Sequence, residues 1–445
     1  MKSQYLSPPN FLNALICLLP LSFILGNSLI NIEIVLISLI GILFYKNQLF
    51  DFKKDNVLIL IIIFFVTLIF STLLEIYKNP ETFELKKAIL FLRYLIFVIV
   101  LRCIVLKEHL NFKMFLLSCL LFATFLSIDI IFQYSFGFNI LGWEAAELRR
   151  SSFFGSEFVA GGYIQRFSVL GIFVIPFFLK KNYHKIIVAF LALIICFLGI
   201  FLSGNRMPTI MFLFFIILLS LVFSLKKIKY TLQLVLALLV IIGTFSFSVG
   251  NIKSMQMNYL RFLGGMPEPA KIISELRRDY PELKRYKGSK KKFHETDAWN
   301  NKSNYEIYHY RTGYTQLYIT SLDIISDNPM IGRGIKSFRN SCWEIVYLPN
   351  RVCENHPHNF YLEILNDTGF VGLVIIMLAL LLLLIKIFKK YGNRFDFFYY
   401  PFLFSLVIEF FPLRSSGSFF STSNAAFIFL LIGILIGMKE LKNKN

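Results

Sequence analysis

The stretch HPHNFYLEILNDTGFVGL, from His356 to Leu373, begins in a long polar segment and runs directly into an apolar one. The pair His358-Asn359 is followed, after nine residues, by Gly369-Phe-Val-Gly372. We therefore expect the imidazole of His358 where a polar domain meets the surface of a bilayer. Histidine is the side chain best able to accept a proton near neutral pH. The position suits chemistry on a lipid-linked substrate, although a lone histidine can also cap or pack against a helix.

The rest of the sequence is dominated by apolar runs. Of its 445 residues, 56% are hydrophobic and 16% are charged, whereas about a quarter of the residues in soluble domains are charged. About 20 apolar residues span the hydrocarbon core of a bilayer. The sequence predicts an all-α polytopic membrane protein with about 12 transmembrane helices, at residues 11–27, 29–45, 57–75, 88–106, 113–137, 162–179, 185–203, 207–225, 229–250, 366–388, 397–413 and 424–438.

Basic residues are concentrated in every second short loop, as the positive-inside rule expects of cytoplasmic loops. With a cytoplasmic N-terminus, clusters such as Lys180-Lys181 and Lys389-Lys390 lie inside, and so does the C-terminus. The short loops of the outer face keep fewer basic residues, namely Lys78, Lys86, Lys87, Arg149, Arg150, Arg206 and Arg414. Because the net charge of +19 is spread over many loops, we expect no nucleic-acid partner.

One long polar segment, at about residues 251–365, falls on the periplasmic face between the ninth and tenth helices. From Tyr305 its pattern predicts an amphipathic helix that ends before Pro329. We divide the chain into the first five helices at 1–150, a catalytic region at 151–385 that includes this segment, and the last two helices at 386–445. The first apolar run shows no small-residue cleavage site, so we expect it to remain as a helix.

Several arginines lie where they could bind an anion. Arg206 stands in LSGNRMPT, the shortest outer loop, just before a helix whose positive end favours anions. Arg311 lies early in the amphipathic helix, Arg166 lies near the outer end of the sixth helix, and Arg339 is a further cationic candidate. Arginine binds phosphate oxygens through a rigid fork of donors and keeps its charge. The alternatives are a snorkelling side chain for Arg206 and solvated helix charges for Arg311 and Arg339.

Small residues mark two further places. The outer loop RRSSFFGSEFVAGGYI, from Arg149 to Ile164, contains one carboxylate, Glu157. This loop either lines a substrate cleft or is only a glycine-rich entry to a helix. Gly369 and Gly372 can let the start of a helix approach another helix closely.

Two of the six cysteines differ from the rest, which fall in apolar runs. Cys342 and Cys353 lie in the outer polar segment with ten residues between them, so a disulfide is plausible in an oxidising compartment. Such a bond would hold the turn that precedes His358. The alternative is a zinc site built on Cys353, His356 and His358, but no fourth ligand is obvious, and a metal-bound His358 could not act as a base.

Four pieces of the sequence, in this order, resemble the bacterial O-antigen ligase and O-antigen polymerase superfamily of membrane glycosyltransferases. They are FFGSEFVAGGYI, LSGNRMPT, the Arg311 helix continuing to NPMIGRGIKSF, and HPHNFYLEILNDTGFVGL. The spacing of His358-Asn359 from the two glycines is the most specific feature. The resemblance covers about residues 150 to 385. The sequence departs from the family at Asn205, where serine is common, but it keeps the following arginine.

The resemblance implies a GT-C-like enzyme of the bacterial inner membrane that performs a metal-independent, inverting glycosyl transfer without a cofactor. The donor would be a glycan on undecaprenyl diphosphate. The acceptor would be a sugar hydroxyl of lipid A–core in a ligase, or another lipid-linked repeat unit in a polymerase. By motif, His358 would be the base for the acceptor hydroxyl, while Arg206 and Arg311 would hold the diphosphate. The expected further substrate contacts are Arg166, Arg339, Asn359 and Glu157.

Other functions remain as alternatives. A related enzyme could transfer the glycan to a protein. A polysaccharide transporter would more often show a charged path through the bilayer centre and two repeated halves. Here the charges within helices are few, and the polar residues are concentrated on one face, which favours chemistry at the membrane surface. Those mid-helix charges are Arg93, Arg102, Asp129 and Glu409.

Overall fold

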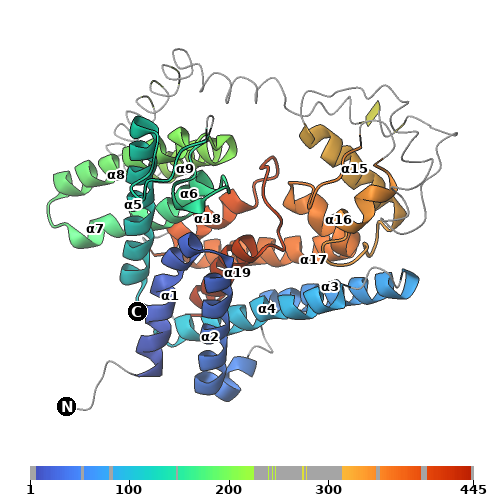
Figure 1. Ribbon diagram of the computed structural model, residues 1–445. Helices are drawn as coiled ribbons and strands as arrows, with labels where there is room; N and C mark the ends of the chain where they lie inside the picture. Colours follow the sequence, from blue (N-terminus) through green and yellow to red (C-terminus); the bar gives the residue numbers. More distant parts are fainter. Residues whose placement is uncertain are drawn as a thin grey trace.

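The computed structural model describes residues 7–51, 55–79, 84–146, 149–224, 313–346, 351–391 and 398–441, together with residues 239, 243, 246, 273, 274 and 277. Within these ranges the chain forms helices and no strand (Figure 1). Nine of the helices in these ranges are long and apolar enough to cross a membrane. The predicted class, a polytopic helical membrane protein, is therefore confirmed.

The helices follow the order of the apolar runs. Their bounds are α1 (Pro8–Leu25), α2 (Asn27–Tyr45), α3 (Asn56–Lys78), α4 (Leu85–Leu106), α5 (Phe112–Phe136), α6 (Ala160–Gly171), α7 (Ile175–Phe178), α8 (Asn182–Leu202), α9 (Arg206–Ser224), α15 (Gly313–Asp327), α16 (Phe338–Ser341), α17 (Phe360–Tyr391), α18 (Tyr400–Glu409) and α19 (Thr422–Glu440).

All the predicted membrane runs except the ninth, at 229–250, contain a described helix. The ninth run lies outside the described residues at all but three positions, so the total of about 12 helices stays a prediction. The sixth run is divided: α6 ends at Gly171, a 3-10 turn follows, and the short α7 begins beside Pro176. The amphipathic helix from Tyr305 is described from Gly313 and ends at Asp327, before Pro329, as predicted.

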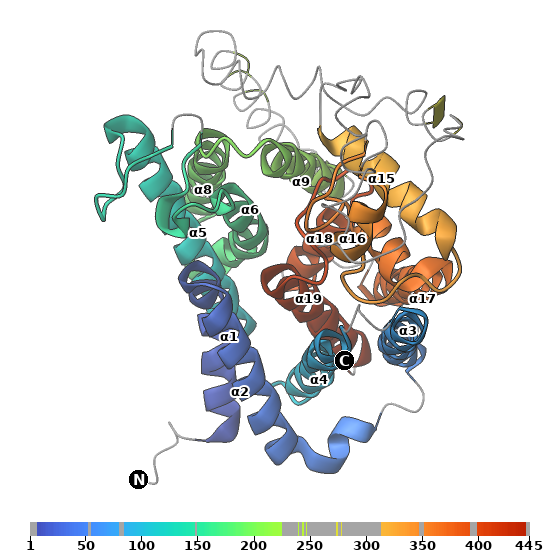
Figure 2. The same ribbon diagram turned by 45° about the vertical axis from the view of Figure 1, so that its right-hand side comes forward.

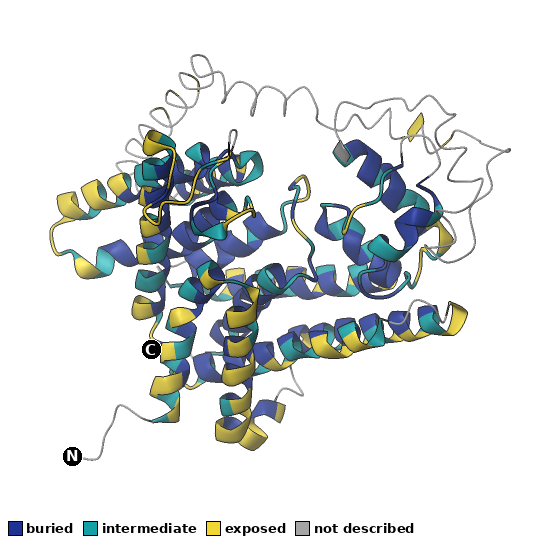
Figure 3. Ribbon diagram, viewed as in Figure 1, coloured by how far each residue is buried: buried dark blue, intermediate teal, exposed yellow. Residues whose placement is uncertain are grey.

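The helix α19 forms the centre of the described bundle. Most of its residues are buried, and it appears almost entirely dark blue in Figure 3. It packs mainly against α4, and Gly433 and Gly437 permit the close approach: a Cβ there would lie 2.9 Å from Leu101 Cβ and 2.6 Å from Val105 Cβ. Around it, α17 packs on α3, and α5 packs on α6 and α8 (Figure 2). The exposed apolar side chains of the outer helices are those expected to face lipid.

The connecting loops gather at two ends of the bundle. At one end, Arg102 pairs with Glu440 at 2.7 Å and Lys439 pairs with Asp55 at 2.5 Å. These residues lie beside loops that the positive-inside rule assigns to the cytoplasm. At the other end, the loops after α3, α8, α15 and α18 contact one another or neighbouring loops. The alternation predicted from charge therefore agrees with the way the helices are joined.

Candidate functional site

His358 lies in the segment that leads into α17, and its backbone is left-handed, with φ of +57°. Such a conformation is uncommon for residues other than glycine. Two contacts with Ser416 hold it there. The Ser416 N–H donates to the His358 carbonyl oxygen at 2.9 Å, and His358 Nδ1 lies 3.1 Å from the Ser416 carbonyl oxygen. The loop between α18 and α19 therefore fixes both the backbone and the ring of His358.

The same contact sets the protonation of the ring. A carbonyl oxygen can only accept, so Nδ1 carries the proton and Nε2 keeps its lone pair. Burial lowers the pKa of His358, although the Ser416 contact and the charge of Glu354 act in the opposite direction. The imidazole is therefore neutral at pH 7, and Nε2 can accept a proton.

Two other rings face His358. Tyr314 of α15 meets it edge to face, with ring centroids 5.4 Å apart. His356 lies closer, with centroids 4.2 Å apart. Burial, followed by the charges of His358 and Arg339, lowers the pKa of His356 to about 4, so this second imidazole is also neutral. The ring of His358 thus packs against the rings of Tyr314 and His356.

Asn359 caps the amino end of α17. Its Oδ1 accepts from the N–H groups of Tyr361 at 3.0 Å and Leu362 at 3.2 Å, and its Nδ2 donates to the Pro412 carbonyl oxygen at 3.1 Å. Side-chain oxygens of asparagine satisfy N–H groups that a helix start would otherwise leave open. This cap explains why α17 begins at Phe360 instead of the predicted residue 366.

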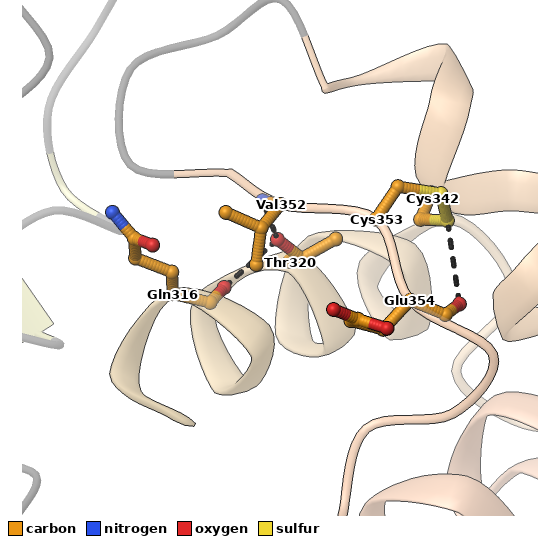
Figure 4. Close-up of a disulfide and its surroundings, with 6 residues drawn as sticks. All are labelled: Gln316, Thr320, Cys342, Val352, Cys353 and Glu354. Atoms are coloured by element: carbon orange, nitrogen blue, oxygen red, sulfur yellow. Dashed lines mark hydrogen bonds between the residues drawn. A yellow bond between two sulfur atoms is a disulfide. The ribbon is translucent and has the colours of Figure 1, made fainter. Parts of the chain in front are cut away.

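A disulfide holds the segment before His358 against α15 and α16. Cys342 and Cys353 are bonded, with Cα atoms 5.1 Å apart. Beside the bond, the Val352 N–H donates to Thr320 Oγ1 at 3.1 Å, and this hydroxyl donates to the Gln316 carbonyl oxygen at 2.8 Å (Figure 4). The bond that the sequence made plausible is thus present, and it restricts the chain that carries both histidines.

Because Cys353 is in the disulfide, its sulfur is not available to the zinc site considered from the sequence. Within the described ranges, no group of three or more histidine, cysteine, aspartate or glutamate side chains could hold a metal ion.

The helix α17 is interrupted at Gly369, where φ of +64° and ψ of −168° are not helical. The segment after α15 packs against the backbone of α17 at this interruption and accepts hydrogen bonds from it. The Phe370 N–H donates to the Pro329 carbonyl oxygen at 2.8 Å, and the Val371 N–H donates to the Met330 carbonyl oxygen at 3.1 Å. A Cβ on Gly369 would lie 2.3 Å from the carbonyl carbon of Met330. Gly369 therefore admits a loop, where the sequence suggested a neighbouring helix.

Gly372 meets its own helix instead of another one. A Cβ on this residue would lie 2.0 Å from Thr368 Oγ1. The turn Gly332-Arg333-Gly334 closes the same region, because Arg333 pairs with Glu344 at 3.0 Å and with Glu75 of α3 at 3.3 Å. The two ion pairs of Arg333 thus hold this turn against the start of α17.

A buried ionic group lies at the foot of the loop between α18 and α19. Glu409, at the end of α18, is fully buried and pairs with Arg166 of α6 at 2.7 Å and with Arg414 at 2.6 Å. Arg166 also donates to Asn424 Oδ1 at 2.7 Å. Two guanidinium groups share one carboxylate, so this group carries one net positive charge. Such a buried charge is costly without an anionic partner.

Sequence analysis found these residues only in part. The sequence predicts Arg166 as a substrate contact, but it shows Glu409 only as a charge within a helix and Arg414 only as a basic residue of an outer loop. Glu409 itself indicates the ionic group, since a carboxylate inside an apolar run requires a cationic partner. The identity of that partner, Arg166 together with Arg414, follows only from the packing of the helices.

Arg206 is the first residue of α9 and follows a tight turn. In this turn Gly204 is left-handed, with φ of +77°, and Asn205 Nδ2 donates to Ser203 Oγ at 2.9 Å. The entry to α6 packs on the turn, because a Cβ on Gly161 would lie 2.4 Å from Ser203 Oγ. The glycine-rich stretch before α6 therefore serves this close packing.

The elements that carry these residues are joined by direct contacts. The start of α9 lies against the start of α6, which bears Arg166, and Arg166 pairs with Glu409 of α18. The loop after α18 carries Arg414 and then Ser416, which holds His358. The histidine and the buried ionic group therefore belong to one assembly.

The remaining predicted residues are placed as follows. Arg339 is half-buried in α16, and Glu157 is exposed in the loop before α6. Arg311 lies outside the described residues, so the structure says nothing of its position.

Comparison with known proteins bears on the same part of the chain. Residues 191–377 match the family model described as O-antigen ligase. The match includes Arg206 and the whole stretch from His356 to Leu373, and it confirms the resemblance stated from the sequence. A search of curated proteins found no match.

Proposed function

We propose, on the premise that residues 191–377 place this chain in the O-antigen ligase superfamily, that it transfers a glycan from undecaprenyl diphosphate to a sugar hydroxyl of lipid A–core. The observation that carries the proposal is the geometry of His358. Its ring is neutral, half-buried and oriented by Ser416, which lies two residues from the cationic side chain of Arg414. A base beside cations is what glycosyl transfer from a diphosphate requires.

In the proposed reaction, Nε2 of His358 takes the proton of the acceptor hydroxyl while its oxygen attacks the anomeric carbon of the donor sugar. The bond between that carbon and the diphosphate oxygen breaks, and its electron pair stays on the diphosphate. Attack and departure occur on opposite faces of the carbon, so the configuration inverts. The lipid-linked diphosphate supplies the driving force.

The cations have the task of stabilising the leaving diphosphate. We assign this task to Arg206 and Arg311 by motif, and preorganised charges of this kind act most strongly in a site that excludes water. Arg166 and Arg414 add the net charge that Glu409 leaves unneutralised. These two are held rigidly by their shared carboxylate, which favours a fixed anion site.

Three residues have supporting roles in the proposal. Asn359 positions His358 by capping α17, because its polar atoms are bonded to the protein. Glu157 is assigned to substrate hydroxyls from its exposed loop. Arg339 is assigned to an anionic group of the substrate.

We further propose that this end of the bundle faces the periplasm and that both termini lie in the cytoplasm. The support is the charge asymmetry of the short loops. The same orientation makes a disulfide between Cys342 and Cys353 compatible with its compartment.

The second candidate function is an O-antigen polymerase, whose acceptor is another lipid-linked repeat unit. The observation that favours it is a second group of cationic side chains, Lys336 and Arg339, of which Arg339 acts on His356. Two such groups suit two diphosphate-linked substrates.

The test compares a strain lacking the gene with strains that express either the wild-type chain or the His358→Ala or Arg206→Ala variant. We expect both variants to lose surface polysaccharide at normal protein levels in the membrane. The rate of transfer should fall about 100-fold or more when the base is removed. Accumulated long lipid-linked chains would identify a ligase, whereas surface lipid carrying single repeat units would identify a polymerase.

The control is His184→Ala, which removes an exposed histidine at the start of α8, on the opposite side of the predicted topology. Normal surface polysaccharide in either the His358 or the Arg206 variant would contradict the proposal.

A further inference from the structure

A second cluster of donors lies beside His358, on the side of α16. It consists of Lys336, Arg339 and His356. Figure 1 shows α16 on the other side of the α18–α19 loop from α6, which bears Arg166. The disulfide brings the cluster together, because Cys342 follows α16 while Cys353 precedes His356 by three residues.

Two nitrogen atoms of this cluster have no hydrogen bond within the described part of the chain. Arg339 Nε and His356 Nε2 are buried without a hydrogen bond. Lys336 and Arg339 form no ion pair with any described residue. Buried donors of this kind are normally satisfied, so their open state points to a missing acceptor.

The carboxylates nearest to Lys336 are already satisfied by other groups. Asp367 accepts from the N–H groups of Lys336 at 2.6 Å and Ser337 at 3.0 Å. Glu363 accepts from Ser418 Oγ and from the Phe419 N–H, both at 2.5 Å. The ammonium group of Lys336 is bonded to neither carboxylate.

Like charges crowd this ammonium group. Burial, followed by the charges of Arg339 and Lys87, lowers the pKa of Lys336, while Glu363 and Asp367 act in the opposite direction. Lys87 itself pairs with Glu84. An anion bound between Lys336 and Arg339 would relieve this repulsion.

The backbone of Lys336 gives independent support. Its φ is +57°, a left-handed conformation that is unfavourable for a residue with a Cβ. Glycine would adopt it without this cost. The strain is maintained by the bonds of Asp367 to residues 336 and 337. Backbone strain of this kind is a reason to look for a function in the side chain.

We propose that Lys336 and Arg339, next to His356, form a second anion site that binds a phosphate group of the acceptor glycolipid. This inference rests on the proposed function and adds to it the chemical class of the acceptor. Two cations fit a dianionic phosphate. The donor diphosphate binds on the side of Arg166 and Arg414. His358 contacts Ser416, in the loop that carries Arg414, and His356, in the second group.

The phosphate can come from two sources, a phosphorylated lipid A–core or a second polyprenyl diphosphate-linked glycan. The experiment therefore measures binding of each lipid to the full chain in nanodiscs, by native mass spectrometry for stoichiometry and by titration for affinity. The third probe is lipid A–core from which the phosphates have been removed.

The variants are Lys336→Gly, Arg339→Gln and the double variant. Lys336→Gly suits the left-handed backbone, so the fold is expected to be retained. The matched control is Lys46→Gly, because Lys46 is also left-handed, with φ of +44°, and lies at the other end of the bundle.

For a ligase, we expect the double variant to bind phosphorylated lipid A–core about 10- to 100-fold more weakly. It should bind the dephosphorylated acceptor as the wild type does. For a polymerase, the wild type should hold two diphosphate lipids and the double variant one. Unchanged affinity and unchanged stoichiometry in the double variant would overturn the inference.

The outcome is separable from that of the proposed function. Binding that depends on Lys336 and Arg339 in a chain without transfer activity would support the site and refute the transferase. The opposite result is transfer that requires His358 while lipid binding does not change when Lys336 and Arg339 are replaced. This result would support the transferase and refute the second anion site.

Discussion

At the scale of single residues, the site depends on side chains that are held by backbone groups. His358 adopts a left-handed conformation because Ser416 bonds both its carbonyl oxygen and its ring. The bond to Nδ1 leaves Nε2 with a lone pair that can accept a proton. The orientation of one imidazole thus depends on a loop that lies nearly sixty residues away in the sequence.

The first prediction concerns pH. A base must be unprotonated, so activity should rise with pH through the pKa of His358 and then become constant. Burial lowers this pKa from its ordinary value of 6.5, so the midpoint of the rise is expected below pH 6.5. The measurement is the pH dependence of kcat/KM for the purified chain. A midpoint above pH 7 would show that the ring is not the neutral base described here.

The second prediction concerns Arg414. In Arg414→Gln the carboxylate of Glu409 still pairs with Arg166, so the chain should fold, but the group loses its net positive charge. We expect the KM for the donor to rise about tenfold or more, because hydrogen bonds to charged groups contribute about 1.5–3 kcal/mol. Kinetics at varied donor concentration measure this effect. Arg414→Lys, which keeps the charge, should recover part of the loss, and an unchanged KM in Arg414→Gln would remove Arg414 from the donor site.

At the scale of elements, the broken helix α17 organises the region. Its amino-terminal part carries the cap that follows His358, and its interruption at Gly369 receives the segment after α15. An unbroken helix would close this entry and displace Met330. The disulfide then joins the end of α16 to the segment that precedes Asn359. The start of α17, the end of α16 and this segment therefore all restrict the position of His358.

The third prediction concerns Gly369→Ala. The added Cβ would be strained by φ of +64° and would lie 2.3 Å from the Met330 backbone, so we expect a clear loss of stability and of activity. The comparison is Gly26→Ala, where φ is +111° but nothing lies within 4 Å. Backbone strain alone costs about 1–2 kcal/mol, and the drop in Tm of the Gly369 variant should exceed that of the Gly26 variant. Equal drops in Tm would mean that the loop does not require the interruption.

At the scale of the whole molecule, the charges of the loops agree with the packing of the helices. The ion pairs of Arg102 with Glu440 and of Lys439 with Asp55 tie the end assigned to the cytoplasm. The other end carries the loops that hold His358 and Arg206. The residues proposed to carry the chemistry therefore lie at one end of a bundle of membrane helices.

The fourth prediction concerns this orientation. A cysteine at the exposed position of Glu157 should react with a membrane-impermeant thiol reagent added to intact cells with a permeable outer membrane. A cysteine in place of Tyr183, which is also exposed, should react only after the inner membrane is disrupted. Free Cys17, Cys103, Cys119 and Cys196 are replaced by alanine in both variants to remove background labelling. Labelling in the reverse order would invert the topology and place His358 in the cytoplasm.

The amino-acid order alone predicts the helical membrane class, the positions of the described spanning helices and a polar-to-apolar junction from His356 to Leu373. Apolar length and loop charge are local properties, so they can be read without contacts. Three features emerge only once the helices are packed: Arg414 shares Glu409 with Arg166, Ser416 fixes the tautomer of His358, and Gly369 receives a loop. Apart from Glu409 and Arg414, which are five positions apart, the paired residues lie tens to hundreds of positions apart. Helix packing sets where they meet, and this leaves no pattern in the chain.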